Sequence, residues 1–344
     1  MEQQDILSMT LPELQAAVQE LGEPKFRAKQ IFNWLHQKRV TDFSEMTTLS
    51  LPFRERLASD FCINRLKIAK RLASSVDDTV KYLYELPDGN YVETVCMQYH
   101  HGTSLCISTQ VGCRMGCRFC ASAIAGFVRN LTPAEMLLQI YETERAQNCK
   151  ISSLVLMGIG EPLDNFDNVL RFLQLLSDPN GYGMSLRHVT VSTCGVVPKI
   201  LELAEQRLGL TLSVSLHCPN DAGRSAIMPI NHSYPIDVLL DACQTYFEKT
   251  GRRVTFEYAV MDQVNSAEQD AAALAERLKG LHAHVNLIPI NPVKERNFHT
   301  LKKTVLQFQK TLERYGIPAT IRRTLGSDIE AACGQLRRDA IQQT

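Results

Sequence analysis

The chain lacks the features that mark a membrane, exported or low-complexity protein. Its 344 residues contain no apolar run near the roughly 18 residues that span a bilayer. The opening Met-Glu-Gln-Gln-Asp offers neither a basic segment nor an apolar one, so we expect no export and a cytoplasmic location. No fixed-period repeat or biased tract is present. These absences leave a globular protein with length for about two domains.

The chain also lacks an excess of charge of either sign. Lys and Arg number 37 and Asp and Glu number 37, which gives a formal net charge of zero. Overall charge therefore does not indicate a nucleic-acid partner, and any such surface must be local. One stretch of the sequence is locally basic and could form such a surface, although it also fits an ordinary solvated helix face. It carries Lys294, Arg296, Lys302, Lys303, Lys310 and Arg314.

Cysteine, by contrast, is plentiful, with 11 residues. Three of them cluster at Cys113, Cys117 and Cys120, while others such as Cys243 lie singly inside apolar runs. A disulfide-rich secreted protein is normally shorter, with cysteines spread along it. The distribution favours a reducing compartment, where clustered cysteine indicates metal binding or catalysis.

The first part of the chain, to about Ala69, is predicted to be helical. Thr10 and Glu13 form a capping-box pattern, and apolar residues follow at helical spacing. From about Thr79 the period changes to two. Residues 81–85 and 91–97 alternate on either side of a Pro-Asp-Gly-Asn turn, which predicts a β-hairpin.

Beyond the hairpin, short apolar runs alternate with helical patterns. The predicted strands are 104–108, 153–157, 188–192, 212–216, 254–260, 285–290 and 319–322. The predicted helices are 133–146, 167–176, 197–206, 236–249, 267–278 and 301–315. Such alternation indicates βαβ units and an α/β fold, a full or partial barrel whose strand C-termini carry the chemistry.

The clustered cysteines have the spacing CxxxCxxC, with Phe119 just before the third. Three thiolates on one loop can hold three corners of a [4Fe–4S] cluster and leave the fourth iron open. A zinc site is the alternative, and it needs a fourth ligand, for which Cys106, His100 and His101 are near in sequence. The usual zinc pattern has a second close-set cysteine pair, which is not found here.

Polar residues recur where predicted strands end. Gly160 and Glu161 follow one strand, and glycines there let a backbone approach a ligand closely. Each such residue taken singly also fits a strand cap. Their recurrence at the same end of successive strands favours ligand binding. The other strand-end residues are the polar Ser192, Ser215, His217 and Asn291 and the apolar Leu216.

The cysteine loop after the first barrel strand resembles that of radical S-adenosylmethionine (SAM) enzymes. This resemblance implies a partial TIM-type (β/α)6 barrel, a [4Fe–4S] cluster on the three cysteines and SAM on the open iron. Glu161 then meets the SAM ammonium, and the other strand-end residues meet its ribose or carboxylate. One electron splits the sulfonium to give a 5′-deoxyadenosyl radical.

Further segments resemble the RlmN subfamily, the dual-specificity RNA methyltransferases that make 2-methyladenosine. They include Tyr91–Val95, Leu105–Cys113, Gly126–Leu131 and Arg323–Leu336, and the likeness runs essentially end to end. It implies methylation of C2 of an adenosine in 23S rRNA, at the peptidyl-transferase centre, and of the adenosine 3′ of the anticodon in some tRNAs. It divides the chain into a helical RNA-binding domain (1–78), a hairpin carrying Glu93 (79–98), the barrel (99–330) and a tail carrying Cys333 (331–344).

Adenine C2 is an electron-poor carbon that cannot attack the SAM methyl, so a one-electron route is needed. The resemblance implies that Cys333 takes a methyl group from a first SAM. A second SAM yields the radical that activates this methyl, which joins to C2. Cys106 then resolves the crosslink by a transient disulfide with Cys333, and Glu93 accepts the C2 proton.

One departure from the family pattern and two alternative functions remain at this point. Ile159 replaces the methionine that the family more often has between the two glycines. The sister Cfr branch attacks adenine C8 with the same cysteine pair, and Pro162 and Val111 favour the C2 branch. A non-enzymatic metal- or cluster-bearing RNA-binding protein is the alternative from a different class. The resemblance further implies a flavodoxin electron donor, and we expect a monomer.

Overall fold

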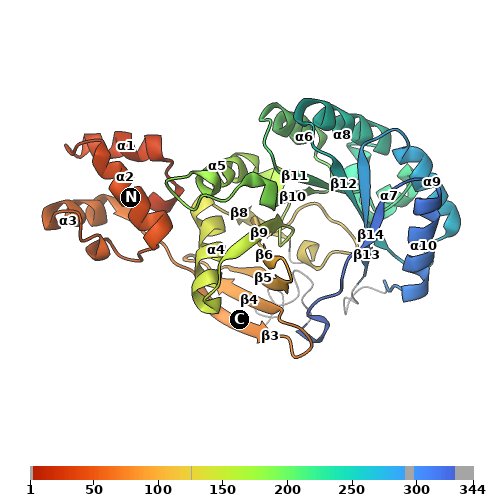
Figure 1. The fold of residues 1–344 in the computed structure, drawn as a ribbon, viewed down its shortest axis with the longest axis horizontal. Coiled ribbons are helices and arrows are strands. Elements are labelled where there is room, and N and C mark those ends of the chain that lie inside the picture. The colour runs from red at the N-terminus through yellow and green to blue at the C-terminus, as the bar shows by residue number, and fades with distance from the viewer. Residues whose placement is uncertain (1–2, 125, 291–297, 330–344) are drawn as a thin grey trace.

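The chain begins with a small helical region. The computed structural model describes residues 3–124, 126–290 and 298–329 (Figure 1). The predicted capping box is present, because Glu13 accepts a hydrogen bond from the Thr10 amide at 2.8 Å. The helices are α1 (Leu11–Glu20), α2 (Phe26–Asn33), which continues as a π-helical turn over Trp34–Lys38, and α3 (Leu51–Asp60). Two short strands, β1 (Gln4–Asp5) and β2 (Phe61–Cys62), pair in parallel and join the two ends of this region.

The helical region packs directly on the barrel helices α4 (Pro133–Gln147) and α5 (Phe166–Ser177). A shared hydrophobic cluster contains buried side chains from both sides. The His36 Nδ1 lies 2.9 Å from the Tyr141 hydroxyl, and Glu13 and Arg171 form an ion pair at 2.7 Å. Apolar burial and polar contacts together therefore fix this region on the barrel.

The centre of the molecule is a ten-stranded sheet (Figure 1). Its order is β14-β13-β12-β11-β10-β9-β6-β5-β4-β3; pairs from β6 to β14 are parallel, and pairs from β3 to β6 are antiparallel. The antiparallel strands are β3 (Lys67–Ala73), β4 (Val80–Glu85) and β5 (Tyr91–Tyr99). The parallel strands are β6 (Gly102–Cys106), β9 (Ile151–Leu156), β10 (Val189–Thr193), β11 (Thr211–Ser215), β12 (Val254–Val260), β13 (Ala283–Pro289) and β14 (Ala319–Ile321).

Six strand–helix units build the parallel part, which confirms the predicted α/β partial barrel. The helices are α4, α5, α6 (Val197–Glu205), α8 (Ile236–Thr250), α9 (Glu268–Leu278) and α10 (Lys302–Arg314), with the short α7 (Asp221–Ile227) before α8. They cover the outer face of the sheet (Figure 1), and β12 is almost wholly buried, as expected for a strand packed on both faces. None of the helices in the described ranges is long and apolar enough to cross a membrane.

The prediction of helix up to about Ala69 was wrong at its end. Residues Lys67–Ala73 form the edge strand β3, which pairs antiparallel with β4 and has an irregularity between Ile68 and Lys70. All but one of its residues are exposed. A strand without a buried face shows no apolar alternation, so the sequence carried no strand signal here. The antiparallel part of the sheet thus begins before residue 79.

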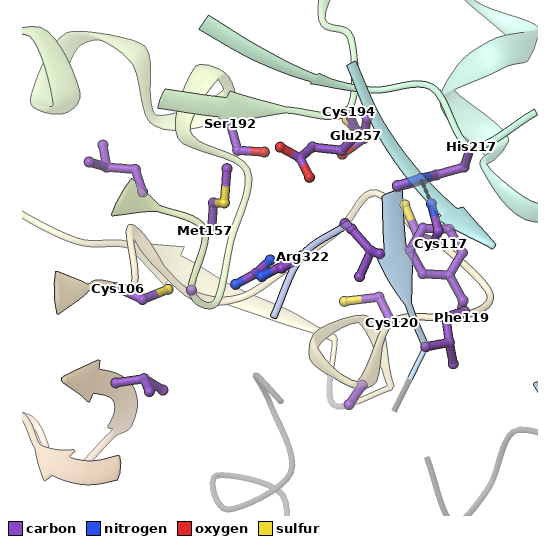
Figure 2. Close-up of a pocket in the computed structure, with 18 of the residues that line it drawn as sticks. Cys106, Cys117, Phe119, Cys120, Met157, Ser192, Cys194, His217, Glu257 and Arg322 are labelled. Carbon is purple, nitrogen blue, oxygen red and sulfur yellow. Dashed lines mark hydrogen bonds between the residues drawn. The ribbon is translucent and has the colours of Figure 1, made fainter. Parts of the chain in front are cut away.

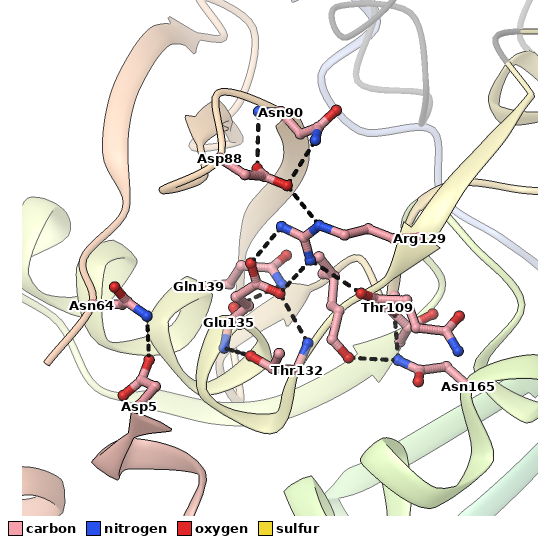
Figure 3. A network of polar contacts seen from close by, with 12 residues as sticks. Asp5, Asn64, Asp88, Asn90, Thr109, Arg129, Thr132, Glu135, Gln139 and Asn165 are labelled. Atoms are coloured by element: carbon pink, nitrogen blue, oxygen red, sulfur yellow. Dashed lines mark hydrogen bonds and ion pairs between the residues drawn. The ribbon is translucent and has the colours of Figure 1, made fainter. Parts of the chain in front are cut away.

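A short hairpin that the sequence did not reveal flanks the cysteine loop. Strands β7 (Gln110–Gly112) and β8 (Phe127–Asn130) pair on either side of it. Arg129 on β8 binds Glu135 at the start of α4 and Asp88 in the β4–β5 turn, each at 2.7 Å (Figure 3). Burial opposes the effect, but the hydrogen bond from Arg129 lowers the pKa of Asp88 to about 2. One guanidinium thus joins the base of the cysteine loop to the barrel and the hairpin.

The buried His36 makes stability depend on pH. Burial lowers its pKa to about 4, with the charge of Asp178 opposing. In the unfolded chain a histidine titrates near 6.5, so the unfolded state binds the proton more readily. The stabilisation is therefore present above pH 6.5 and is lost as the pH falls toward 4.

We predict that wild-type protein loses about 2 kcal/mol more than a His36→Gln variant between pH 7 and pH 5. Glutamine preserves a partner for Tyr141 but does not titrate. Urea unfolding of both proteins at the two pH values measures the difference. An equal loss in the two proteins would contradict the assignment.

Candidate active site

A cavity of about 350 Å³ opens at the C-terminal ends of the parallel strands. Residues from β9 to β13 and the loops after them line one part of its wall. The cysteine loop, the end of β5 and residues 322–325 line the rest. In Figure 2, Cys106 and Met157 lie on one side, Cys117, Cys120 and Phe119 lie on the other, and Arg322 lies between. This is the edge of the sheet at which the sequence predicted the chemistry.

The cysteine loop runs from β7 to β8 with a closely fixed base. Gly112 has φ of +80°, and a Cβ there would clash with the carbonyl oxygen of Gly126. The Cys113 amide donates to that same oxygen at 3.1 Å. In the middle of the loop, the Arg118 amide donates to the Ile227 carbonyl at 2.9 Å. The loop backbone is thus held both at its base and at its middle.

All three loop cysteines line the cavity. Burial raises the pKa of Cys113 to about 12 and raises that of Cys117 well above its ordinary range. The neighbouring thiols add to both shifts, since their negative charges repel. A metal centre in the shared space would deprotonate these thiols, because a coordinating thiol loses its proton to the metal. The donor set therefore fits an iron–sulfur cluster.

The three loop cysteines line the wall of the cavity and do not converge on the position of a single metal ion. Across the described ranges, no group of three His, Cys, Asp or Glu side chains is gathered around the position of one metal ion. A single zinc ion needs its ligands within about 2.3 Å of one centre. A four-iron cluster is several atoms across, so its ligands stand further apart.

The turn after β9 holds Glu161 at the cavity wall. A Cβ at Gly160 would lie 2.7 Å from the Gln110 Cβ, so only glycine fits, and the Glu161 amide donates to the Gln110 side chain at 2.8 Å. The Glu161 carboxylate is buried and accepts hydrogen bonds from the amides of Cys194 (2.8 Å) and Leu163 (3.0 Å). Burial raises its pKa, and these bonds oppose the shift. A carboxylate held in this way can receive an ammonium group.

Of the other predicted strand-end residues, Ser192, Ser215 and His217 line the cavity. The His217 Nδ1 accepts a hydrogen bond from the Ala259 amide at 2.9 Å, so its ring proton is assigned to Nε2. Burial lowers the pKa of His217 to about 3, so the ring is neutral near pH 7. The centroids of the His217 and Phe119 rings lie 4.7 Å apart in an edge-to-face arrangement. This contact connects the cysteine loop to the end of β11.

One predicted cofactor contact, Leu216, does not line the cavity. The Leu216 side chain is fully buried in the hydrophobic core, and its amide donates to the Glu257 carbonyl at 3.0 Å. Asn291 lies outside the described residues. The structure thus brings together the predicted glycine–glutamate turn, the two serines and the histidine.

Cys106 lines the cavity at the end of β6, directly opposite Val95 on β5. Glu93 lies two residues before Val95, hence on the same face of the sheet, but it does not line the cavity. It is buried and forms an ion pair with Lys81 at 2.9 Å; the two side chains are 1% and 0% exposed. Sequence reasoning missed Lys81, whose partner depends on strand register.

Arg224 is a second fully buried cation that sequence reasoning missed. Its guanidinium donates to the carbonyl oxygens of Cys194 (2.7 Å), Ser215 (3.2 Å) and Leu216 (3.2 Å), and to the Asn231 side chain (2.8 Å). Burial lowers its pKa. These carbonyls belong to the loops that follow β10 and β11, so Arg224 fixes the backbone beneath the cavity. Nothing in its local sequence distinguishes it from a surface arginine of α7.

Glu257 and Arg322 also line the cavity, and the sequence analysis predicted neither of them. Glu257 is buried on β12 and accepts hydrogen bonds from Ser213 (2.6 Å) and Asn286 (2.8 Å). Burial raises its pKa, while these bonds and the charge of Arg322 oppose the shift. Arg322 is exposed within the cavity, where it offers a positive charge to a bound anion.

Comparison with known proteins identifies the fold and the family. Residues 4–63 match the family described as "Ribosomal RNA large subunit methyltransferase N-terminal domain", and residues 107–275 match the "Radical SAM superfamily". The "Probable dual-specificity RNA methyltransferase RlmN" of Lachnoclostridium phytofermentans is 51% identical, over 99% of this chain and 96% of its own. The protein of the same name from Alkaliphilus oremlandii is 50% identical, over 99% and 100%. A radical SAM methyltransferase from Sphaerobacter thermophilus superposes with a TM-score of 0.92 at 40% identity, over 96% and 98% of the two chains.

This chain belongs to the RlmN family.

As an RlmN-family protein it is a radical SAM RNA methyltransferase that uses a [4Fe–4S] cluster and SAM. The zinc site, the non-enzymatic RNA-binding protein and the Cfr branch are therefore not favoured. Cys333 lies outside the described residues, and the predicted disulfide between Cys106 and Cys333 is not borne out by the structure. In this RlmN-family site, the three loop cysteines would hold the cluster and Glu161 would face SAM.

We predict that Arg224→Lys destabilises the protein by about 3 kcal/mol, because lysine lacks the planar fork and leaves buried carbonyls without donors. Affinity for SAM falls as well, since these carbonyls belong to the cavity loops. Urea unfolding and calorimetric titration of the reconstituted enzyme measure the two effects. Arg277→Lys, on the exposed side of α9, is the matched control. A change within that of the control would refute the role given to Arg224.

Proposed function

We propose that this protein methylates C2 of a specific adenosine in 23S rRNA, at the peptidyl-transferase centre, and of the adenosine 3′ of the anticodon in a subset of tRNAs. The observation that carries the proposal is that one cavity brings Cys106 together with the three cysteines of the CxxxCxxC loop. A cluster site alone fits many radical SAM reactions. An additional thiol in the same cavity supports a reaction that passes through a sulfur-bound carbon.

The chemistry follows from the properties of adenine C2, which is too electron-poor to displace a methyl group from a sulfonium. When bound, the cluster and SAM supply a one-electron route to this carbon. Cys113, Cys117 and Cys120 hold the cluster, and Glu161 receives the SAM ammonium. The neutral His217 and the hydroxyls of Ser192 and Ser215 line the SAM space.

The thiols carry and release the transferred carbon. Cys333 takes the methyl group as the sulfur–methyl bond of a first SAM breaks. With a second SAM and the cluster bound, one hydrogen atom would leave this methyl group as part of 5′-deoxyadenosine, and the carbon would bond to adenine C2 as well as to sulfur. The adduct would then lose one electron to the cluster and its C2 proton. Cys106 attacks the Cys333 sulfur, a disulfide forms, and the sulfur–carbon bond breaks with its electron pair going to the carbon, which takes up a proton to become the product methyl group. The position of Cys106 in the cavity supports this step.

Glu93 is the proposed acceptor of the C2 proton. It lies on the same face of β5 as Val95, and a diagonal neighbour such as Cys106 on β6 stands about 7–8 Å away. The ammonium of Lys81 stabilises the negative charge that a proton acceptor needs. Burial excludes water from the pair, which strengthens this interaction. Lys81 acts through Glu93 and is a positioning residue.

We predict that Glu93→Gln lowers formation of 2-methyladenosine by at least about 100-fold and leaves RNA covalently attached to the protein. Denaturing gels with labelled RNA detect the adduct. Because the variant leaves Lys81 without its partner, cluster content and thermal unfolding are measured alongside. Glu85→Gln, on the neighbouring strand, is the control and should behave as wild type. Normal turnover without an adduct would rule out Glu93 as the acceptor.

The proposed RNA contacts are the basic side chains of the helical region and the start of α10. Helix α10 returns antiparallel to β13, so its first residues, Lys302 and Lys303, lie at the cavity end of the barrel. Lys310 and Arg314 lie about 12–18 Å further along the helix, and Arg314 pairs with Glu268. Lys294 and Arg296 lie outside the described residues. The target adenine must leave its stack to enter the cavity.

The proposed division of labour keeps RNA binding in residues 1–78, Glu93 in the hairpin 79–98, cluster and SAM in 99–330, and Cys333 in 331–344. Pairing of β3 with β4 connects the first two parts. We further propose a cytoplasmic monomer with a flavodoxin-type electron donor. A reducing compartment keeps the cavity thiols available for this chemistry.

Mass spectrometry of RNA nucleosides tests the function. We predict 2-methyladenosine in 23S rRNA and tRNA from cells that carry the gene, and its loss from both when the gene is deleted. Wild-type protein should restore it, whereas Cys117→Ala should not. 8-Methyladenosine in place of the 2-methyl nucleoside would assign the chain to C8 chemistry.

A further inference from the structure

Residues 322–329 lead the chain from the cavity wall toward Cys333. Arg322, Thr324 and Leu325 line the cavity. The Leu325 side chain packs against the small cluster formed by Val95, Met97 and Cys106. The segment that leads to one of the two proposed reactive thiols therefore lies over the other.

Two aspartates tie this segment to the turn between β3 and β4. Asp328 accepts hydrogen bonds from the Ser74 hydroxyl (2.6 Å), the Ser75 amide (2.7 Å) and the Ser75 hydroxyl (2.8 Å). In the opposite direction, the Gly326 amide donates to Asp77 at 2.9 Å. We call this set of contacts, Ser74, Ser75 and Asp77 with Gly326 and Asp328, the clasp. It joins positions about 250 residues apart.

The turn is shaped to receive the segment. The Ser74 amide donates to the Thr79 carbonyl at 2.8 Å, and the Asp77 carboxylate also accepts from the Thr79 amide at 2.9 Å. The Ser74 hydroxyl accepts from the amides of Val76 and Asp77 at 3.1 Å, which directs its proton toward Asp328. The hydrogen bonds from Ser74 and Ser75 lower the pKa of Asp328 to about 2, so it is ionised throughout the physiological range.

An exposed loop contact of this kind is commonly worth little to stability. Its place in the chain gives it a different consequence. Cys333 lies five residues beyond Asp328, the last residue of the clasp, and five residues of chain span at most about 18 Å. Upstream of the clasp, Arg322 is held by a hydrogen bond from its amide to the Leu287 carbonyl at 2.8 Å. From Arg322 to Cys333 the chain has eleven residues and spans up to about 38 Å.

We propose that the clasp is a positioning device, which fixes the point from which the Cys333 segment starts beside Cys106 and so keeps Cys333 within reach of the cavity. The inference rests on the proposed function, because it assigns the clasp a part in the same reaction. The effective concentration of a tethered group falls roughly as the −3/2 power of tether length. Lengthening the tether from five to eleven residues therefore lowers the concentration of Cys333 at the cavity about threefold.

The experiment compares two products of the reconstituted enzyme with SAM, a reductant and RNA. 5′-Deoxyadenosine reports cleavage of SAM, and 2-methyladenosine reports transfer of carbon through Cys333. Asp328→Asn removes the charge while preserving shape. The double variant Ser74→Ala/Ser75→Ala opens the clasp from the other side. Asp237→Asn, an exposed aspartate paired with Arg277 on the outer face of the barrel, is the control.

We expect both clasp variants to form 5′-deoxyadenosine within about twofold of wild type and to yield roughly threefold less 2-methyladenosine per 5′-deoxyadenosine. Asp328→Glu should restore part of the ratio. A merely structural contact would lower both products together, so a parallel fall in both overturns the inference. So does a ratio equal to that of Asp237→Asn. Wild-type protein that forms neither product would instead refute the proposed function, and the inference with it.

Discussion

Parallel strands end with carbonyl groups that point out of the same edge of a sheet, and these groups need donors. Arg224 supplies donors to two of the strand ends beneath the cavity, and the site depends on this arrangement. Its contact with the Cys194 carbonyl fixes a residue whose amide binds Glu161. The Glu161 amide binds Gln110 at the start of the cysteine loop. A chain of hydrogen bonds therefore runs from the buried guanidinium to Gln110, the first residue of β7, which leads into the cysteine loop.

Where a function depends on local spacing, the sequence was sufficient to predict it. The strand predicted over 254–260 is β12 with the same bounds, because an apolar run between two polar turns needs no knowledge of its neighbours. The cysteine loop and the Gly160–Glu161 turn were predicted for the same reason. A parallel barrel brings successive strand ends together, so predicted residues on separate strands meet in one cavity.

Features that depend on pairing between distant segments were not predictable. Lys81 and Glu93 meet only because β4 and β5 take one register. Asp328 and Ser75 meet across most of the chain. Leu216 shows the opposite failure: it follows a strand as a cavity residue should, but its side chain turns into the core. Side chains alternate between the two faces of a strand, so an error of one residue in where a strand ends places a side chain on the wrong face.

The edge strand β3 has a consequence for how the molecule behaves among its own copies. An open sheet offers unpaired backbone groups at its last strand, where another chain can add. Here that strand carries Lys67, Lys70 and Arg71, and its pairing is interrupted between Ile68 and Lys70. A second copy adding edge to edge would bring like charges together along an irregular backbone. This arrangement therefore disfavours the addition of further copies along the edge of the sheet.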